Sequence, residues 1–223
     1  TSSSLHTWEG WVRGLERQRR VITFDLPGFG LTGPRASGDY RVDTDARFVL
    51  DLLDALGLAK VVLGGNSLGG EVAWRAATLA PDRIDRLILV DAAGLAVDRS
   101  GLPLAWLMAR TPVLNRLGEH VLPRALVAEG VAKAYGGPDK ISGELVDRHF
   151  ELALREGNRR ALSKRIGQYQ PGADADRIAT VRQPTLILWG GRDGLIPLAA
   201  GREFHARIAG STLEVFDDLA HLP

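Results

Sequence analysis

Short runs of apolar residues recur along the chain and predict the strands of one sheet. Four of them are apolar almost throughout, at residues 21–24, 61–63, 87–90 and 185–189, and a weaker fifth spans residues 212–216. Continuous rather than alternating apolar runs are typical of parallel strands that are buried on both faces. We therefore predict a mostly parallel sheet.

Between these runs, apolar residues return every three or four positions, which is the period of an amphipathic helix. This pattern predicts helices over residues 42–56, 68–80 and 198–208, and Gly57 and Pro81 end the first two. Alternating strands and helices favour an α/β fold, in which helices cover both faces of a parallel sheet.

One long stretch interrupts this rhythm. Residues 95–182 contain no convincing strand, and prolines and glycines divide them into helical segments. The apolar spacing predicts these helices over residues 102–110, 117–134, 141–155 and 159–169. We interpret the stretch as a helical cap inserted into an α/β core that is formed by residues 1–94 and 183–223.

Composition narrows the class of protein. The 223 residues are 45% hydrophobic and 25% charged, with a formal net charge of +1, so nothing favours binding to nucleic acid or to an anionic membrane surface. The absence of cysteine excludes disulfides and thiolate catalysis. No apolar run is long enough to span a membrane, and no signal peptide is visible, so we expect a cytoplasmic protein.

A glycine-rich segment carries the strongest chemical signal. Residues 65–69 read Gly-Asn-Ser-Leu-Gly, directly after one predicted strand and directly before a predicted helix. This is the context of a nucleophile elbow, a tight turn that presents the hydroxyl of Ser67 above a helix N-terminus. Gly65 and Gly69 would have no Cβ to clash across so tight a turn.

A serine nucleophile needs a base, and the base needs an acid to orient it. Of the five histidines, His221 comes after the last strand-like run, at the carboxyl end where ligand sites of parallel sheets gather. His149 stays an alternative base, because the inserted helices could fold over the serine. Asp193 comes directly after the run at 185–189 and is the predicted acid, with Asp91 as the alternative.

With these residues in place, the chain resembles the α/β-hydrolase superfamily over nearly its whole length. The resemblance is to the cap-bearing branch of bacterial esterases, lipases and carbon–carbon bond hydrolases. The order Ser67, Asp193, His221 is that of the family's nucleophile, acid and base. Residues 24–30 (FDLPGFG) resemble the family's D-x-P-G-x-G turn, which we interpret as structural.

The resemblance also implies an oxyanion hole built from two main-chain N–H groups. Leu68, the residue after the nucleophile, would supply one of them. The other comes from a loop that usually reads His-Gly-x; residues 1–8 resemble the segment directly after such a pair, so Thr1 or Ser2 would supply it. The first three strands and the helix after His221 would then be absent, and we expect a longer parent to be the more active form.

Three functions are compatible with these motifs. A carboxylic ester hydrolase acting through an acyl-enzyme is the one we favour. A carbon–carbon bond hydrolase of meta-cleavage-type diketone products is the alternative. Such enzymes typically have a tryptophan after the catalytic histidine, where this chain has Leu222, and a cap arginine, for which Arg155, Arg159 and Arg165 are candidates. The third is a non-catalytic small-molecule receptor on the same fold.

The apolar residues between 102 and 117 predict a pocket for a small apolar ester. The histidines are scattered, with no His-Glu-x-x-His pattern, and no glycine-rich phosphate loop is convincing. We therefore expect neither a metal nor a cofactor. The sequence leaves the oligomeric state open.

Overall fold

The computed structural model describes residues 3–96, 111 and 118–222, and contains a four-stranded parallel sheet with the order β1-β2-β3-β4. The strands are β1 (Val61–Asn66), β2 (Ile84–Val90), β3 (Thr185–Gly190) and β4 (Thr212–Phe216). The first part of the chain forms η1 (Leu5–Trp8), α1 (Glu9–Leu15), α2 (Val42–Ala55), α3 (Leu68–Leu79) and η2 (Pro81–Arg83). The remaining helices are α6 (Arg124–Tyr135), η3 (Pro138–Lys140), α7 (Gly143–Leu154), α8 (Asn158–Gln168), η4 (Ala175–Thr180) and α9 (Leu198–Arg207).

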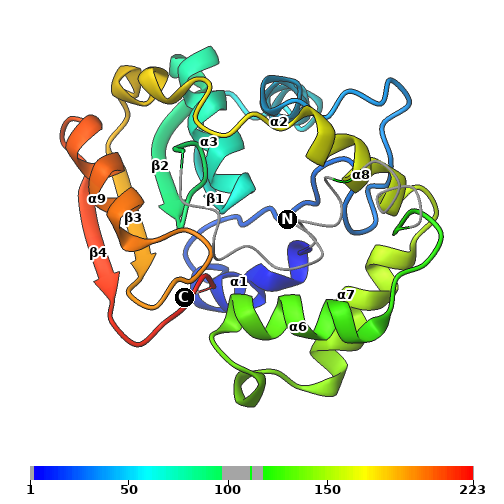
Figure 1. Ribbon diagram of the computed structural model, residues 1–223. Helices are drawn as coiled ribbons and strands as arrows, with labels where there is room; N and C mark the ends of the chain where they lie inside the picture. The colour runs from blue at the N-terminus through cyan, green and yellow to red at the C-terminus, as the bar shows by residue number, and fades with distance from the viewer. Residues whose placement is uncertain (1–2, 97–110, 112–117, 223) are drawn as a thin grey trace.

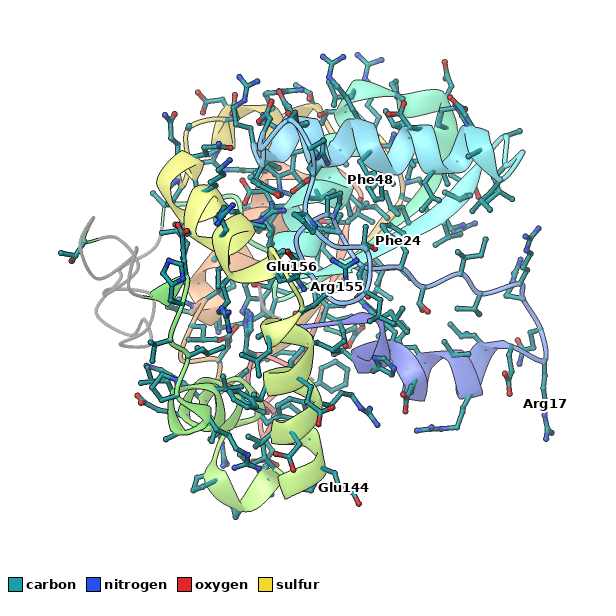
Figure 2. The ribbon with its side chains drawn as sticks, turned by 90° about the vertical axis from the view of Figure 1, so that its right-hand side faces the viewer. Arg17, Phe24, Phe48, Glu144, Arg155 and Glu156 are labelled. Carbon is teal, nitrogen blue, oxygen red and sulfur yellow. The ribbon has the colours of Figure 1, made fainter. Side chains whose placement is uncertain are left out.

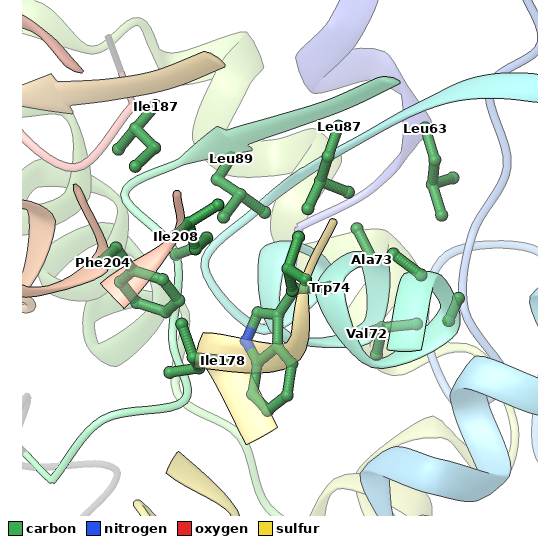
Figure 3. Close-up of a cluster of buried hydrophobic side chains, with 14 of the residues drawn as sticks. Leu63, Val72, Ala73, Trp74, Leu87, Leu89, Ile178, Ile187, Phe204 and Ile208 are labelled. Atoms are coloured by element: carbon green, nitrogen blue, oxygen red, sulfur yellow. The ribbon is translucent and has the colours of Figure 1, made fainter. Parts of the chain in front are cut away.

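The core lies on one face of the sheet, where α3, η4 and α9 pack (Figures 1 and 3). Trp74 of α3 and Phe204 of α9 are fully buried against strand residues such as Leu89. Trp74 also satisfies its indole N–H by donating to the carbonyl of Ala93 at 3.1 Å. Burying large apolar side chains of this kind supplies most of the stabilisation of such a domain.

Burial on the opposite face differs from the prediction. Along β1, Leu63 and Gly65 are buried, whereas Val62 is 52% exposed and Gly64 is also exposed. The continuous apolar run therefore does not correspond to a strand buried on both faces. The predicted fold class is confirmed, a parallel sheet flanked by helices, and β3 is buried along nearly its whole length, so the difference from the prediction concerns the exposed face of β1.

The apolar run at residues 21–24 is not a strand. It is extended, but β1 pairs only with β2, and none of the described strands runs beside these residues. Ile22 is 38% exposed, and Phe24 packs its ring against Phe48 of α2, with 6.3 Å between centroids (Figure 2). An apolar run indicates that a segment tends to be buried, but a β-strand also needs a neighbouring strand with which to form main-chain hydrogen bonds.

Between β2 and β3, the described residues contain helices and no strand. Helices α7 and α8 match the predicted ranges within two residues. The helix expected at residues 117–134 instead begins at Arg124, because Pro123 occupies its N-cap position and a proline is not tolerated inside a helix. The predicted helix at residues 102–110 lies outside the described residues. No helix in the described part of the chain is both long and apolar enough to cross a bilayer.

Candidate active site

Ser67 occupies the sharp turn between β1 and α3. Its backbone angles, φ 55° and ψ −121°, belong to a region that residues other than glycine rarely adopt. Its N–H donates to the carbonyl of Val90 at 3.0 Å, and its carbonyl accepts from Ala93 N–H at 2.9 Å. The turn is therefore held from both sides by the end of β2, and strain of this kind is typical of functional positions.

Two glycines let the turn close. A Cβ on Gly65 would lie 2.1 Å from the carbonyl oxygen of Gly69, and one on Gly70 would lie 2.6 Å from Cβ of Ala92. At Gly69 itself, a Cβ would meet nothing within 4 Å. The expectation for Gly65 is confirmed, whereas the close approach expected at Gly69 occurs at Gly70.

This difference yields a matched pair of variants. Gly65→Ala is expected to lower the free energy of unfolding by about 3 kcal/mol, because the clash is with backbone that cannot move without opening the elbow. Gly69→Ala should leave stability equal or raise it by up to about 1 kcal/mol, because alanine is the better helix former. Urea unfolding of both variants measures the difference, and equal losses would contradict the geometry.

Asp193 and His221 form a buried hydrogen-bonded pair. Nδ1 of His221 lies 2.7 Å from Oδ2 of Asp193, and both residues are less than a tenth exposed. Because a carboxylate only accepts, Nδ1 carries the hydrogen and Nε2 is left as the basic nitrogen. The other oxygen of Asp193 accepts from the N–H groups of Leu195 and Ile196, at 2.7 and 3.0 Å. The carboxylate is thus fixed in position by three donors.

Asn66 connects the elbow to the histidine, and sequence reasoning assigned it no such role. Its side-chain amide donates to the main-chain carbonyl of His221 at 2.9 Å and to that of Val90 at 3.2 Å. The residue beside Ser67 therefore holds the segment that carries His221. No spacing rule could have found this contact, because the two residues lie 155 positions apart.

The alternative base and acid take other positions. His149 lies in α7, where its Nδ1 is 2.8 Å from the carbonyl of Leu145 in the same helix. Asp91 is completely buried directly after β2, and its Oδ1 accepts from Gly190 N–H at 2.9 Å. Among the described residues, Asp193 is the carboxylate that is hydrogen-bonded to His221.

The proposed oxyanion donors are only partly described. Leu68 is the first residue of α3, so its N–H has no acceptor within the helix. Thr1 and Ser2 lie outside the described residues. The nearby Leu5 N–H donates to Oδ1 of Asp25 at 2.7 Å, while Leu31 N–H donates to the other oxygen at 3.1 Å.

The turn at residues 24–30 therefore has the structural role that the sequence indicated. Asp25 is buried and fastens the start of the chain to this turn. Gly30 has a φ of 48°, and a Cβ there would collide with the Asp25 carboxylate. A side chain at position 30 would thus displace the residue that orders the N-terminal loop.

The arginines of the inserted segment are not equally free to bind a substrate. Arg165 is buried, forms an ion pair with Asp45, and donates to the carbonyl of Pro27 at 2.8 Å. Nε of Arg159 donates to the carbonyl of Glu119 at 2.9 Å. Arg155 is exposed at the end of α7 (Figure 2). The Arg165 side chain therefore fastens α8 to the core.

A second link between α8 and the core contains a titrating carboxyl group. The hydroxyl of Tyr169, at the end of α8, donates to Oε2 of Glu71 in α3 at 2.8 Å. Glu71 is buried, and this burial raises its pKa to about 7 even though the Tyr169 hydroxyl and Arg75 oppose the shift.

Glu71 should make stability depend on pH. Because its pKa is raised in the folded state, the folded protein retains the proton between about pH 4.5 and 7, where the unfolded chain has lost it. Stability should therefore fall as pH rises through this window, by up to about 3 kcal/mol. In Glu71→Gln this part of the fall should disappear, whereas Glu144→Gln on the exposed start of α7 should keep it. Thermal unfolding at pH 5 and pH 8 tests this, and parallel curves for wild type and Glu71→Gln would contradict it.

The comparisons with known proteins agree with this architecture. Residues 2–112 match the model of the alpha/beta hydrolase fold family. A 2-hydroxy-6-oxo-2,4-heptadienoate hydrolase of Pseudomonas putida is 30% identical over 96% of this chain and 77% of its own length. This chain belongs to the α/β-hydrolase family.

The relatives include an uncharacterised protein, a meta-cleavage product hydrolase and an esterase. An uncharacterised protein of Mycobacterium tuberculosis is 33% identical over 97% of this chain, and the chain spans 66% of that relative's length. A solved meta-cleavage product hydrolase from Pseudomonas fluorescens IP01 is 25% identical, with a TM-score of 0.84 over 99% of this chain and 79% of its own. A thermophilic esterase from Thermogutta terrifontis is also 25% identical, with a TM-score of 0.78 over the same shares of the two chains.

Proposed function

We propose that the protein is a serine hydrolase that cleaves small apolar carboxylic esters through an acyl-enzyme. The observation that carries the proposal is the buried hydrogen bond between His221 and Asp193. Asn66, which directly precedes the strained Ser67, donates to the main-chain carbonyl of His221 and so holds the segment that carries the histidine. In this mechanism Nε2 of His221 accepts the Ser67 hydroxyl proton while Oγ attacks the acyl carbon. The alcohol leaves with that proton, and water then releases the acid by the same steps.

The negative charge on the carbonyl oxygen needs donors that are already in place. The N–H of Leu68, at the positive end of α3, is the first, and Thr1 or Ser2 is proposed as the second. Asp193 orients the imidazole and stabilises its protonated form during each transfer. No step requires a metal or a cofactor.

We also propose that residues 95–182 form a cap over this site, inserted into a core of residues 1–94 and 183–223. In support, Cβ of Ala220, the neighbour of His221, would lie 3.0 Å from a Cβ on Gly136 at the end of α6. At the other side, the Arg165–Asp45 ion pair fastens α8 to α2. A cap joined in this way would enclose the acyl group of a substrate.

Carbon–carbon bond hydrolysis is the second candidate, and it is favoured by the Pseudomonas putida relative and by the Pseudomonas fluorescens structure. Two features count against it. Leu222 stands directly after His221 where the resemblance leads us to expect tryptophan, and Arg165 is committed to Asp45 rather than to a substrate carboxylate.

A substrate series on the full-length protein separates the two candidates. We expect p-nitrophenyl acetate and butyrate to be hydrolysed at least 100-fold faster than a vinylogous 1,5-diketone acid. The opposite ranking, with ester turnover near background, would favour the carbon–carbon bond hydrolase. Saturable binding of both compounds without turnover of either would favour a receptor.

A further inference from the structure

Asp91 shares an uncommon backbone conformation with the proposed nucleophile. Among the described residues, Ser67 and Asp91 are the two that have positive φ without being glycine, at 55° and 42°. They come directly after the neighbouring strands β1 and β2, so both lie at the carboxyl edge of the sheet. Such conformations persist where the surrounding structure enforces them, and they are concentrated at functional sites.

The carboxyl group of Asp91 is buried and only half satisfied. Its Oδ1 accepts one hydrogen bond, from Gly190 N–H, while Oδ2 has no partner among the described residues. One oxygen each of Asp91 and Asp193 and one ring nitrogen of His221 lie within 4.8 Å of one another. Asp193 has three donors and Asp91 has one, so a single negative charge shared by the two carboxyls belongs on Asp193.

We propose that Asp91 is a neutral, proton-bearing positioning residue behind the Asp193–His221 pair, and that it becomes the acid partner of His221 when Asp193 is removed. The inference rests on the proposed function. In the intact site the hydrogen on Oδ2 of Asp91 faces Asp193. Because Asp91 is then neutral, the site contains one buried carboxylate charge rather than two. Without Asp193, Asp91 loses that proton to solvent and its carboxylate accepts from Nδ1–H of His221.

The electrostatics of the cluster agree with this role. Burial is the main reason why the pKa of Asp91 is raised, to about 9, and the negative charge of Asp193 raises it further, whereas the Gly190 N–H lowers it. Asp193 and His221 are the other two titratable groups in this cluster. A cation is not needed to explain the cluster, because Nδ1 of His221 and Oδ2 of Asp193 already form a hydrogen bond with each other.

The first experiment tests the proton on Asp91 without relying on activity. Asp91→Asn removes a carboxyl that must stay protonated, so its melting temperature should rise relative to wild type as the pH increases from 5 to 8. Glu71 titrates in both proteins and cancels from the difference. Asp51→Asn, on the exposed side of α2, is the matched control and should show no such trend. A pH-independent difference for Asp91→Asn would overturn the proposal.

The second experiment tests the link to His221 with p-nitrophenyl butyrate and the full-length protein. Asp193→Ala should retain residual turnover that rises at least tenfold between pH 6 and pH 9, as Asp91 ionises. In Asp193→Ala/Asp91→Asn this rise should be absent and turnover at pH 9 at least tenfold lower. Identical pH profiles for the two variants would overturn the role of Asp91. If wild type hydrolyses neither esters nor diketones, the proposed function fails, whereas the melting temperatures still decide whether Asp91 carries a proton.

Discussion

Ser67→Ala is expected to lower kcat for p-nitrophenyl butyrate by about 10⁴-fold or more. The substitution removes the hydroxyl that would form the proposed acyl-enzyme and leaves the turn, its strained φ and the helix N-terminus in place. KM should change little, because the hydroxyl contributes little to ground-state binding. Steady-state kinetics on the full-length protein, together with thermal unfolding, measure both effects.

A matched control is available for this variant. Ser37 is exposed, and its hydroxyl accepts only a 3.3 Å hydrogen bond from Asp39 N–H among the described contacts. Ser37→Ala should therefore retain wild-type kcat. If Ser67→Ala kept more than a tenth of the activity with an unchanged melting temperature, Ser67 would not be the nucleophile.

His221→Gln is expected to have the second largest effect, a fall in kcat of about 10³- to 10⁴-fold. Glutamine fills much of the same space, but it cannot accept the serine proton and return it to the leaving group. Steady-state kinetics of wild type and variant at pH 8, together with thermal unfolding, measure this loss.

His149→Gln separates the two candidate bases. Nδ1 of His149 is hydrogen-bonded to the carbonyl of Leu145 within the same helix, and burial lowers the pKa of His149. The variant should retain kcat within about threefold of wild type. A large loss of activity in His149→Gln with little loss in His221→Gln would reverse the assignment.

The fold class and the neighbourhood of the strand ends could be predicted from the sequence. Strand ends of a parallel sheet meet at one edge, so Asp193 and His221, placed after two strand-like runs, were expected to lie together, and they are hydrogen-bonded. The elbow was recognisable because a strand, a glycine-flanked serine and a helix succeed each other directly.

The features that the sequence could not predict depend on contacts between distant segments. The run at residues 21–24 has the composition of a strand but no neighbour to pair with among the described strands. Whether one face of β1 is exposed depends on which segments pack over that face, and the pattern of apolar residues within the strand does not reveal this. The bond from Asn66 to the His221 carbonyl and the burial of Asp91 beside Asp193 appear only when the strand ends are placed in space.

Ser67 is proposed to be a nucleophile that His221 activates. Labelling with diethyl p-nitrophenyl phosphate, combined with mass spectrometry of the digested protein, tests it most directly. We predict one diethylphosphoryl group on the peptide that carries Ser67, with labelling abolished in Ser67→Ala and slowed at least 100-fold in His221→Gln. Absence of the adduct in an active protein, or an adduct on another residue at the same rate in Ser67→Ala, would contradict the claim.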